Sequence, residues 1–406
     1  MKKRTQRFML WFTVVGALVF FLNCRSGSPG PGEPGLGAAV APAAVVKPAE
    51  KFVMLFATGV SGELVDCGCP GHPRGGLARR AEVARGLADA NPGHFLNLDA
   101  GNSFFAMTPP AVPGDDKKQQ ARVMAKSLSY MGVNAINVGP MDLAAGLPFL
   151  RDELARAGAS ELPFISANLT DPATGKPLFP AYREFKIGER NVCVLGLTQP
   201  VGMDGAVAVA DPAASLKATV GELESKCDLI VGLFAMPIHA ASELARQSPG
   251  VDIIIISDRS SAPAPRPLVL GDTAIFQAGA RGMYLGRLDL TLLPTKPATG
   301  AGISGEERAK VEAELARVVA QVKMLEGDIV NDPQLAGVYK KAKAEEKALR
   351  EKLGQSSAGY DFENALISLD ITMPEDRQVA AWVAETGVKP RTPVTPTLEP
   401  PTAPAH

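Results

Sequence analysis

Histidine is scarce in this sequence. Only four occur in 406 residues, at positions 72, 94, 239 and 406. Because imidazole is a principal donor to transition metals, this scarcity restricts any metal centre that needs several histidines. The sequence also lacks an excess of charge of either sign, since 42 Lys and Arg balance 43 Asp and Glu to a net charge of -1. A nucleic-acid-binding surface needs a concentrated basic face, so we expect no nucleic-acid partner.

Long apolar runs without charge are confined to the N-terminus. After a basic region, the apolar run Phe8–Leu22 is shorter than the roughly 20 residues that a spanning helix needs, and it fits the core of an export signal. The next residues, FLNC at 21–24, resemble a lipoprotein signal box, which makes 1–24 the predicted signal peptide and Cys24 the lipidated residue. The first and third residues of this box depart from the usual leucine and small residue, so an uncleaved anchor is the alternative. Both interpretations predict an exported, membrane-anchored protein facing the periplasm or the exterior.

Changes in composition divide the remaining chain into five segments. A Gly/Pro/Ala-rich stretch is typical of a flexible tether, and the Thr/Pro-rich C-terminus is typical of disorder. The predicted segments are a tether at 25–50, an α/β domain at 51–295, a helical hairpin at 303–355, a small strand-helix element at 356–388 and a disordered tail at 389–406.

Strand-like and helix-like patterns alternate over the predicted α/β domain. The runs LIVGLFA at 229–235 and IIII at 253–256 are continuously apolar, as in strands buried on both faces of a sheet. Asp211 and Pro212 are typical of an N-cap and a first helical residue. This alternation predicts layered sheets and helices.

The segment at 303–355 has a different period. Apolar residues recur at steps of four and three, which is a heptad seam: Val311, Leu315, Val318, Val322 and Leu325. A second helix is predicted to begin at Asp332-Pro333. We expect a hairpin that packs on the α/β domain, binds a protein partner or forms a dimer.

Several motifs occur in the same order as in a known family. They are FATGVSGEL at 56–64, GGLARRAEV at 75–83, NLDAGNSFF at 97–105 and MGVNAINVGPMDLAAGL at 131–147. In this order they resemble the metal-dependent phosphoesterases of the periplasmic 5'-nucleotidase (UshA-like) kind. The resemblance implies a calcineurin-like metallophosphoesterase fold, which is a β-sandwich flanked by helices.

The same resemblance implies two divalent metals, held by Asp, His and Asn, that activate a water against phosphorus. None of the expected histidines is present at the matching positions. Only Asn102 and Asp258 could donate an oxygen, and His94 and His239 lie away from the expected ligand positions. We therefore expect no metal at these positions, which are Gly59, Ser61, Asn102, Pro140, Met141, Ala235, Ser257, Asp258, Arg259 and Ser260.

The loop DCGCPGHPRGG at 66–76 follows the first of these positions. It resembles a loop in a subgroup of UshA-like proteins that has Cys-Gly-Cys before Gly-Gly-Leu-Ala-Arg, and in which a cysteine can be replaced by selenocysteine. That resemblance points to thiol redox chemistry. From the residues alone, Gly68 lets the backbone bend so that Cys67 and Cys69 can converge, and the following helix N-terminus with nearby arginines favours a thiolate.

Other interpretations of this loop stay open. The pair could form a purely structural disulfide or an inert turn, as exported cysteines often do. Cys67, Cys69 and His72 could bind a soft metal such as Cu(I) or Zn, although a fourth ligand is not visible. Haem attachment needs Cys-x-x-Cys-His and is excluded. Arg74, Gly75 and Gly76 could bind an anion at the helix start, but packing is the default interpretation.

Two further cysteines lie inside the α/β domain. Cys193 falls within a predicted strand and Cys227 ends a predicted helix. We expect buried free thiols, with a bridge as the alternative because the protein is exported.

Together these patterns predict an exported lipoprotein with a degenerate metallophosphoesterase fold and a thiol redox or binding role at Cys67 and Cys69. The alternatives are a non-catalytic scaffold of the cell envelope and a residual metal-dependent phosphoesterase. No cofactor is expected.

Overall fold

The computed structural model describes residues 47–69, 71–200, 205–260, 262–294, 305–328, 335–353 and 359–391. The predicted export signal, Cys24, most of the tether, the Asp332-Pro333 helix start and nearly all of the tail lie outside these ranges. Among the described residues, no helix combines the length and the apolar character needed to cross a membrane.

Two six-stranded mixed sheets form the framework of residues 47–391. The first has the order β14-β13-β1-β2-β3-β4, with bounds Tyr360–Ser368, Tyr284–Leu292, Glu50–Ala57, Phe95–Asp99, Ala135–Asn137 and Phe164–Ile165. The second has the order β11-β12-β10-β9-β7-β6, with bounds Leu268–Leu270, Thr273–Phe276, Ile253–Ile256, Leu229–Ala235, Arg190–Thr198 and Tyr182–Ile187. A small antiparallel pair joins β5 (Leu169–Thr170) to β8 (Ala208–Val209).

The central strands are parallel, and their apolar runs face packed layers on both sides. In β9 and β10 every residue is buried. Alternate side chains of these strands pack toward the other sheet in one core, which includes Phe56, Phe276 and Leu288. This arrangement confirms the predicted sandwich of layered sheets.

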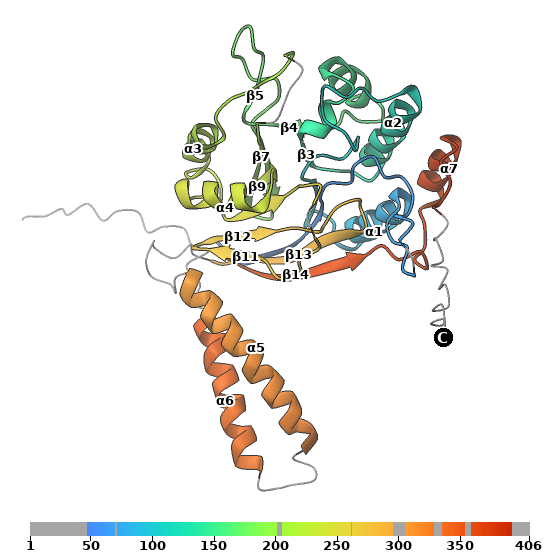
Figure 1. The fold of residues 1–406 in the computed structure, drawn as a ribbon. Coiled ribbons are helices and arrows are strands. Elements are labelled where there is room, and N and C mark those ends of the chain that lie inside the picture. Colours follow the sequence, from blue (N-terminus) through green and yellow to red (C-terminus); the bar gives the residue numbers. More distant parts are fainter. Residues whose placement is uncertain are drawn as a thin grey trace, which may run out of the picture. The chain divides into compact units, whose positions relative to one another are not determined.

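Helices cover the outer faces of the two sheets (Figure 1). A second core joins the first sheet to α1 (Leu77–Ala90), α2 (Asp115–Tyr130) and α7 (Arg377–Glu385). A third core joins the second sheet to α3 (Pro212–Leu223) and α4 (Ile238–Gln247). Two short helical turns lie at Pro140–Leu143 and Phe149–Leu154.

The N-cap prediction for α3 is confirmed. Asp211 accepts a hydrogen bond of 2.7 Å from the backbone N–H of Ala214, and Pro212 is the first helical residue.

The strand-helix element near the C-terminus is built into the α/β unit. β14 pairs antiparallel with β13 along its whole length, from Tyr360 opposite Leu292 to Ser368 opposite Tyr284. Val379 of α7 is fully buried in the same core as α1. The C-terminal residues are therefore part of the packing that surrounds the first sheet.

The predicted hairpin consists of α5 (Gly305–Asp328) and α6 (Ala336–Leu353). Three of the five predicted seam residues, Val318, Val322 and Leu325, are buried together with Ala342 in a small core of their own. Burial of the heptad positions is what drives two such helices together.

The expectation of free thiols at Cys193 and Cys227 is wrong, because a disulfide joins the two residues with a Cα–Cα distance of 5.9 Å. β7 and β9 are parallel neighbours, and Cys193 pairs in register with Ile230. Cys227 lies just before β9 and is therefore brought beside Cys193. Sequence spacing could not reveal that adjacency.

Candidate functional site

The positions that match metal ligands in the resembling family converge at one edge of the molecule. Gly59, Asn102, Pro140, Ala235 and Ser257 each follow or end a parallel strand, and the carboxyl ends of such strands face a ligand crevice. A pocket of about 180 Å³ lies there, and its lining residues are Asn102, Thr108, Pro140, Met141, Gln199, Ala235, Met236, Pro237, Ser257, Asp258 and Arg259.

Asn102 is at the centre of these positions and its amide is fully engaged. Its Oδ1 accepts a hydrogen bond from the backbone N–H of Met141 at 3.2 Å. Its Nδ2 donates to the backbone oxygen of Ser257 at 3.2 Å. Asn102 has a positive φ of 58°, a conformation that asparagine tolerates better than most residues. Its side chain thus joins the end of β2 to the loops after β3 and β10.

Ser257 connects the remaining strand ends. Its hydroxyl donates to the carbonyl of Gly101 at 2.5 Å and accepts from the N–H of Gly59 at 3.0 Å. Ser257 is completely buried. Hydrogen bonds within the chain therefore hold together the positions at which the resembling family places metal ligands.

These residues do not fit a dinuclear metal centre. The oxygen of Asn102 is already an acceptor for a backbone N–H, and Asp258 is the only carboxylate among the matching positions. Such centres depend on several imidazole and carboxylate donors. Within the described ranges, no group of three or more His, Cys, Asp or Glu is placed to hold a metal ion.

His94 and His239 lie away from the pocket, as the sequence predicted. His94 immediately precedes β2, at the end of the strand opposite to the pocket, and its Nε2 is 3.6 Å from Glu50. His239 is exposed in the first turn of α4.

The buried residue Asp142 directly follows Met141 of this pocket and was not predicted from the sequence. Its carboxylate accepts four backbone N–H bonds, from Asn102 and Gly139 at one oxygen and from Ser103 and Phe104 at the other, over 2.7–3.0 Å. The only sequence feature that could have indicated it is its position as an acidic residue directly after Pro140 and Met141.

The charge state of Asp142 reflects opposing influences. Burial raises the pKa of this carboxyl to about 6, and the nearby charge of Asp99 acts in the same direction, whereas the N–H donors of Phe104, Gly139 and Asn102 lower it. With a pKa near 6 the group is mostly ionised at neutral pH. It then serves as an acceptor for all four N–H groups.

The Cys67–Cys69 loop forms a second candidate site. A disulfide joins the two cysteines, whose Cα atoms are 5.3 Å apart. Gly68 adopts a positive φ of 64°, which confirms the bend predicted for this glycine. The N–H of Cys67 donates to the carbonyl of Arg74 at 2.8 Å, so the loop folds back on itself before α1.

Side chains from distant segments hold this loop in place, and none of these side chains was predicted from the sequence to do so. Arg281 donates to the carbonyl of Cys67 at 3.1 Å and forms an ion pair of 3.0 Å with Glu63. Arg391 forms a second ion pair with Glu63, at 2.9 Å. Met283 contacts the sulfur of Cys69 at 3.9 Å. None of these residues is near the loop in sequence except Glu63.

The two candidate sites are adjacent but distinct. The backbone N–H of Arg281 donates to the carbonyl of Gly59 at 2.8 Å, while its side chain binds Cys67. The lining of the 180 Å³ pocket includes neither Cys67 nor Cys69. The cysteines instead face the start of β13 and the C-terminal residues.

The proposed anion-binding residues of the loop are already engaged. Arg74 donates to the hydroxyl of Tyr284 at 2.6 Å and lies over its ring. The N–H of Gly75 donates to the carbonyl of Leu369 at 2.7 Å. Gly76 is the N-cap of α1. These contacts support packing at the helix start, which was the default interpretation.

His72 is exposed and is not grouped with the cysteines as a metal site. Hydrogen bonds from the N–H and hydroxyl of Thr372 lower the pKa of the neighbouring Asp370 carboxyl, and the charges of Arg74 and His72 act in the same direction. His72 thus contributes to the electrostatics of the rim of the loop.

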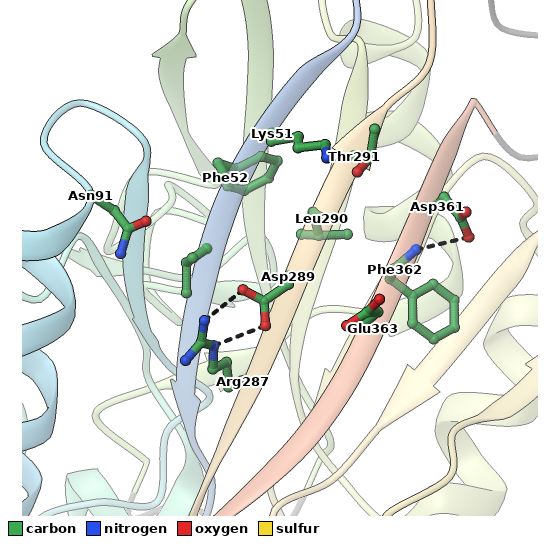
Figure 2. A pocket seen from close by; sticks show the side chains of 11 residues that line it. Lys51, Phe52, Asn91, Arg287, Asp289, Leu290, Thr291, Asp361, Phe362 and Glu363 are labelled. Carbon is green, nitrogen blue, oxygen red and sulfur yellow. Dashed lines mark hydrogen bonds and ion pairs between the residues drawn. The ribbon is translucent and has the colours of Figure 1, made fainter.

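A larger pocket of about 510 Å³ lies across β1, β13 and β14 (Figure 2). Arg287 and Asp289 form an ion pair of 2.7 Å in it, and Lys51 and Glu363 supply further charges. None of the residues predicted from the sequence lines this pocket.

No protein-family model matches the chain. A 2',3'-cyclic-nucleotide 2'-phosphodiesterase/3'-nucleotidase of Salmonella typhimurium is 26% identical over 290 residues, which are 61% of this chain and 42% of that protein. A 5'-nucleotidase of Vibrio cholerae is 28% identical over 215 residues, which are 44% of this chain and 38% of that protein. The matches thus span about two fifths of these relatives.

Solved structures resemble a larger share of the chain. A 5'-nucleotidase precursor from Thermus thermophilus superposes with a TM-score of 0.57 and 18% identity, covering 83% of this chain and 58% of that one. A sulfate thiohydrolase, SoxB, from the same genus gives a TM-score of 0.58 and 17% identity, covering 84% and 61%.

The paired sheets, their covering helices and the crevice at the strand ends define a metallophosphoesterase-like α/β fold. Parts of the chain are similar in sequence to these two nucleotide hydrolases, and its fold is that of the 5'-nucleotidase structure from Thermus thermophilus. This confirms the resemblance that the sequence motifs indicated.

Proposed function

We propose that this chain is a thiol–disulfide redox protein built on a metallophosphoesterase fold that no longer binds catalytic metals. The observation that carries the proposal is the Cys67–Cys69 pair, which is bridged across a single glycine in a loop held by Arg281 and Glu63.

The short spacing of the pair favours a reactive role over a structural one. A cross-link stabilises a protein mainly by restricting the unfolded chain, and its effect grows with the length of the closed loop. The paired cysteines are 2 and 34 residues apart in sequence. The expected contributions to the free energy of unfolding are about 1.5 kcal/mol for Cys67–Cys69 and about 4 kcal/mol for Cys193–Cys227. The second bridge suits a structural role, whereas the first adds little to stability.

The location of the pair is compatible with redox chemistry. Exchange needs access of an external thiolate to a sulfur atom, and Cys69 is partly exposed. In the other bridge Cys193 is buried and Cys227 is also partly exposed. The two bridges therefore differ in the length of the chain that they close and not in access.

We expect Cys67–Cys69 to be reduced under milder conditions than Cys193–Cys227. The full chain would be equilibrated with graded ratios of reduced and oxidised glutathione, alkylated, and examined by intact mass and peptide mapping. Cys193–Cys227 is the internal control in the same sample, since it joins residues 34 apart in sequence and its cross-link is expected to contribute more to the free energy of unfolding. If both disulfides are reduced at the same glutathione redox potential, or if Cys67 and Cys69 are never found as a disulfide, the redox role is wrong.

Residual hydrolysis is a second candidate, because the relatives carry the names of a phosphodiesterase and a nucleotidase. We expect no turnover of a phosphodiester or of a 5'-nucleotide when Mn²⁺ or Zn²⁺ is added to the purified chain, since the donor set around Asn102 cannot hold two metals. The control is the same assay after Asn102→Ala and Asp258→Ala. Metal-dependent turnover that either substitution removes would contradict the inactive-site proposal.

The setting of the protein follows from the N-terminal sequence. We propose export and lipid attachment at Cys24, with 25–50 as the tether. The hairpin of α5 and α6 is a proposed surface for a protein partner or a second copy. Intact mass of membrane-extracted protein tests the lipid, because an acylated Cys24 adds a defined mass.

A further inference from the structure

The two sulfur atoms of the Cys67–Cys69 bridge have different surroundings. Cys67 is buried, with only 5% of its surface exposed, and both its N–H and its carbonyl are held, by Arg74 and Arg281. Cys69 is partly exposed. Because attack on a disulfide depends on which sulfur can be reached, the exposed atom is favoured as the point of attack.

The sulfur of Cys67 also has a hydrogen-bond donor. The backbone N–H of Cys69 donates to Cys67 Sγ at 3.2 Å. A donor aimed at a sulfur stabilises the thiolate form, and a more stable thiolate leaves faster in exchange. The positive charge of Arg281, bound to the carbonyl of Cys67, acts in the same direction.

One side of the loop is closed to an incoming group. A Cβ atom added at Gly68 would lie 2.5 Å from Cβ of Arg391, so Arg391 packs directly against the glycine between the cysteines. The Glu63 ion pair holds Arg391 in this position. Arg391 therefore covers Gly68, whereas Cys69 remains partly exposed.

Resting on the proposed redox function, we propose that Cys69 is the sulfur attacked by an incoming thiolate and that Cys67 is the leaving sulfur. The external thiolate forms a bond to Cys69 Sγ, and the Cys67–Cys69 bond breaks with its electron pair passing to Cys67 Sγ. The products are a mixed disulfide on Cys69 and a thiolate on Cys67. A second external thiol then attacks the mixed disulfide, which releases the oxidised external pair and leaves both cysteines reduced.

The assignment can be tested on the full wild-type chain. The oxidised protein would be exposed briefly to glutathione, quenched with N-ethylmaleimide, and digested with trypsin. Peptide 52–74 contains both cysteines and no internal Lys or Arg, so fragment masses show which residue carries glutathione. We expect glutathione on Cys69 in about tenfold or greater excess, with maleimide on Cys67.

Single variants provide a second measurement. Cys69 in the Cys67→Ser chain should react with oxidised glutathione at least about tenfold faster than Cys67 in the Cys69→Ser chain. Unfolding midpoints of both variants control for the fold. Preferential labelling of Cys67, or equal labelling, would overturn the assignment while leaving the redox function intact. A wild-type bridge that glutathione does not open would overturn both.

Discussion

Replacing Asp142 with asparagine is expected to lower the free energy of unfolding by about 3 kcal/mol or more. Each oxygen of this buried carboxylate accepts two backbone N–H bonds. Asparagine has nearly the same shape, but in either orientation its NH₂ group would face two N–H donors. Those donors would lose their acceptor in a site without access to water, and an unsatisfied buried group is costly.

Urea denaturation at neutral pH would measure this loss. Asp171→Asn is the matched control, because Asp171 also accepts two backbone N–H bonds, from Ala173 and Thr174, but on an exposed loop where water can replace them. We expect the control to change stability by less than about 1 kcal/mol. Equal effects of the two substitutions would contradict the role assigned to Asp142.

Replacing Asp99 with asparagine is expected to cost about 3–5 kcal/mol, the usual range for breaking a buried ion pair. Asp99 is completely buried and its Oδ2 lies 2.9 Å from Arg80, which is 2% exposed. Within the described part of the chain, Nε and Nη1 of Arg80 have no hydrogen-bond partner. The guanidinium would then be left charged and without its carboxylate.

The comparison is Glu153→Gln, which makes the same chemical change in the exposed Arg122–Glu153 pair. Exposed pairs contribute little, so we expect a loss below about 1 kcal/mol there. The Arg80→Leu/Asp99→Asn double variant should recover part of the loss, since it removes the unpaired charge. If Asp99→Asn alone matches Glu153→Gln, the buried pair does not stabilise the fold.

Both carboxylates lie under the crevice and explain how its shape is kept. Asp99 accepts the N–H of Gly101 at 3.0 Å, and Asp142 accepts the N–H of Asn102. Their carboxylates accept N–H groups of the loop after β2, while the hydroxyl of Ser257 donates to the carbonyl of Gly101 in the same loop. Hydrogen bonds within the chain therefore hold the strand ends together at the pocket.

Much of the fold could be predicted because its signals are local. The continuous apolar runs of β9 and β10 indicated strands buried on both faces, and the heptad seam indicated the α5–α6 hairpin. The ordered motifs predicted the metallophosphoesterase-like fold. The prediction that Gly59, Pro140 and Met141 hold no metal rests on residue identity at the matched positions, so it needed no coordinates.

The surroundings of the cysteines could not be predicted in this way. Arg281 precedes β13 and Arg391 follows α7, more than 200 residues from the Cys67–Cys69 loop. Their contacts depend on the pairing of β13 with β1 and on the packing of α7 against the same core as α1. Such long-range neighbours leave no periodic pattern in a single sequence.

The sequence by itself determined which chemical groups this protein has and lacks: two cysteines around a glycine, almost no histidine, and an acidic residue after Pro140 and Met141. Only the tertiary structure decided how those groups are used. It joined Cys193 to Cys227 because β7 and β9 are neighbours, it placed four N–H donors around Asp142, and it buried Cys67 while leaving Cys69 partly exposed. The physical reason is that burial and hydrogen bonding are set by the segments that pack together, and those segments are distant in the chain.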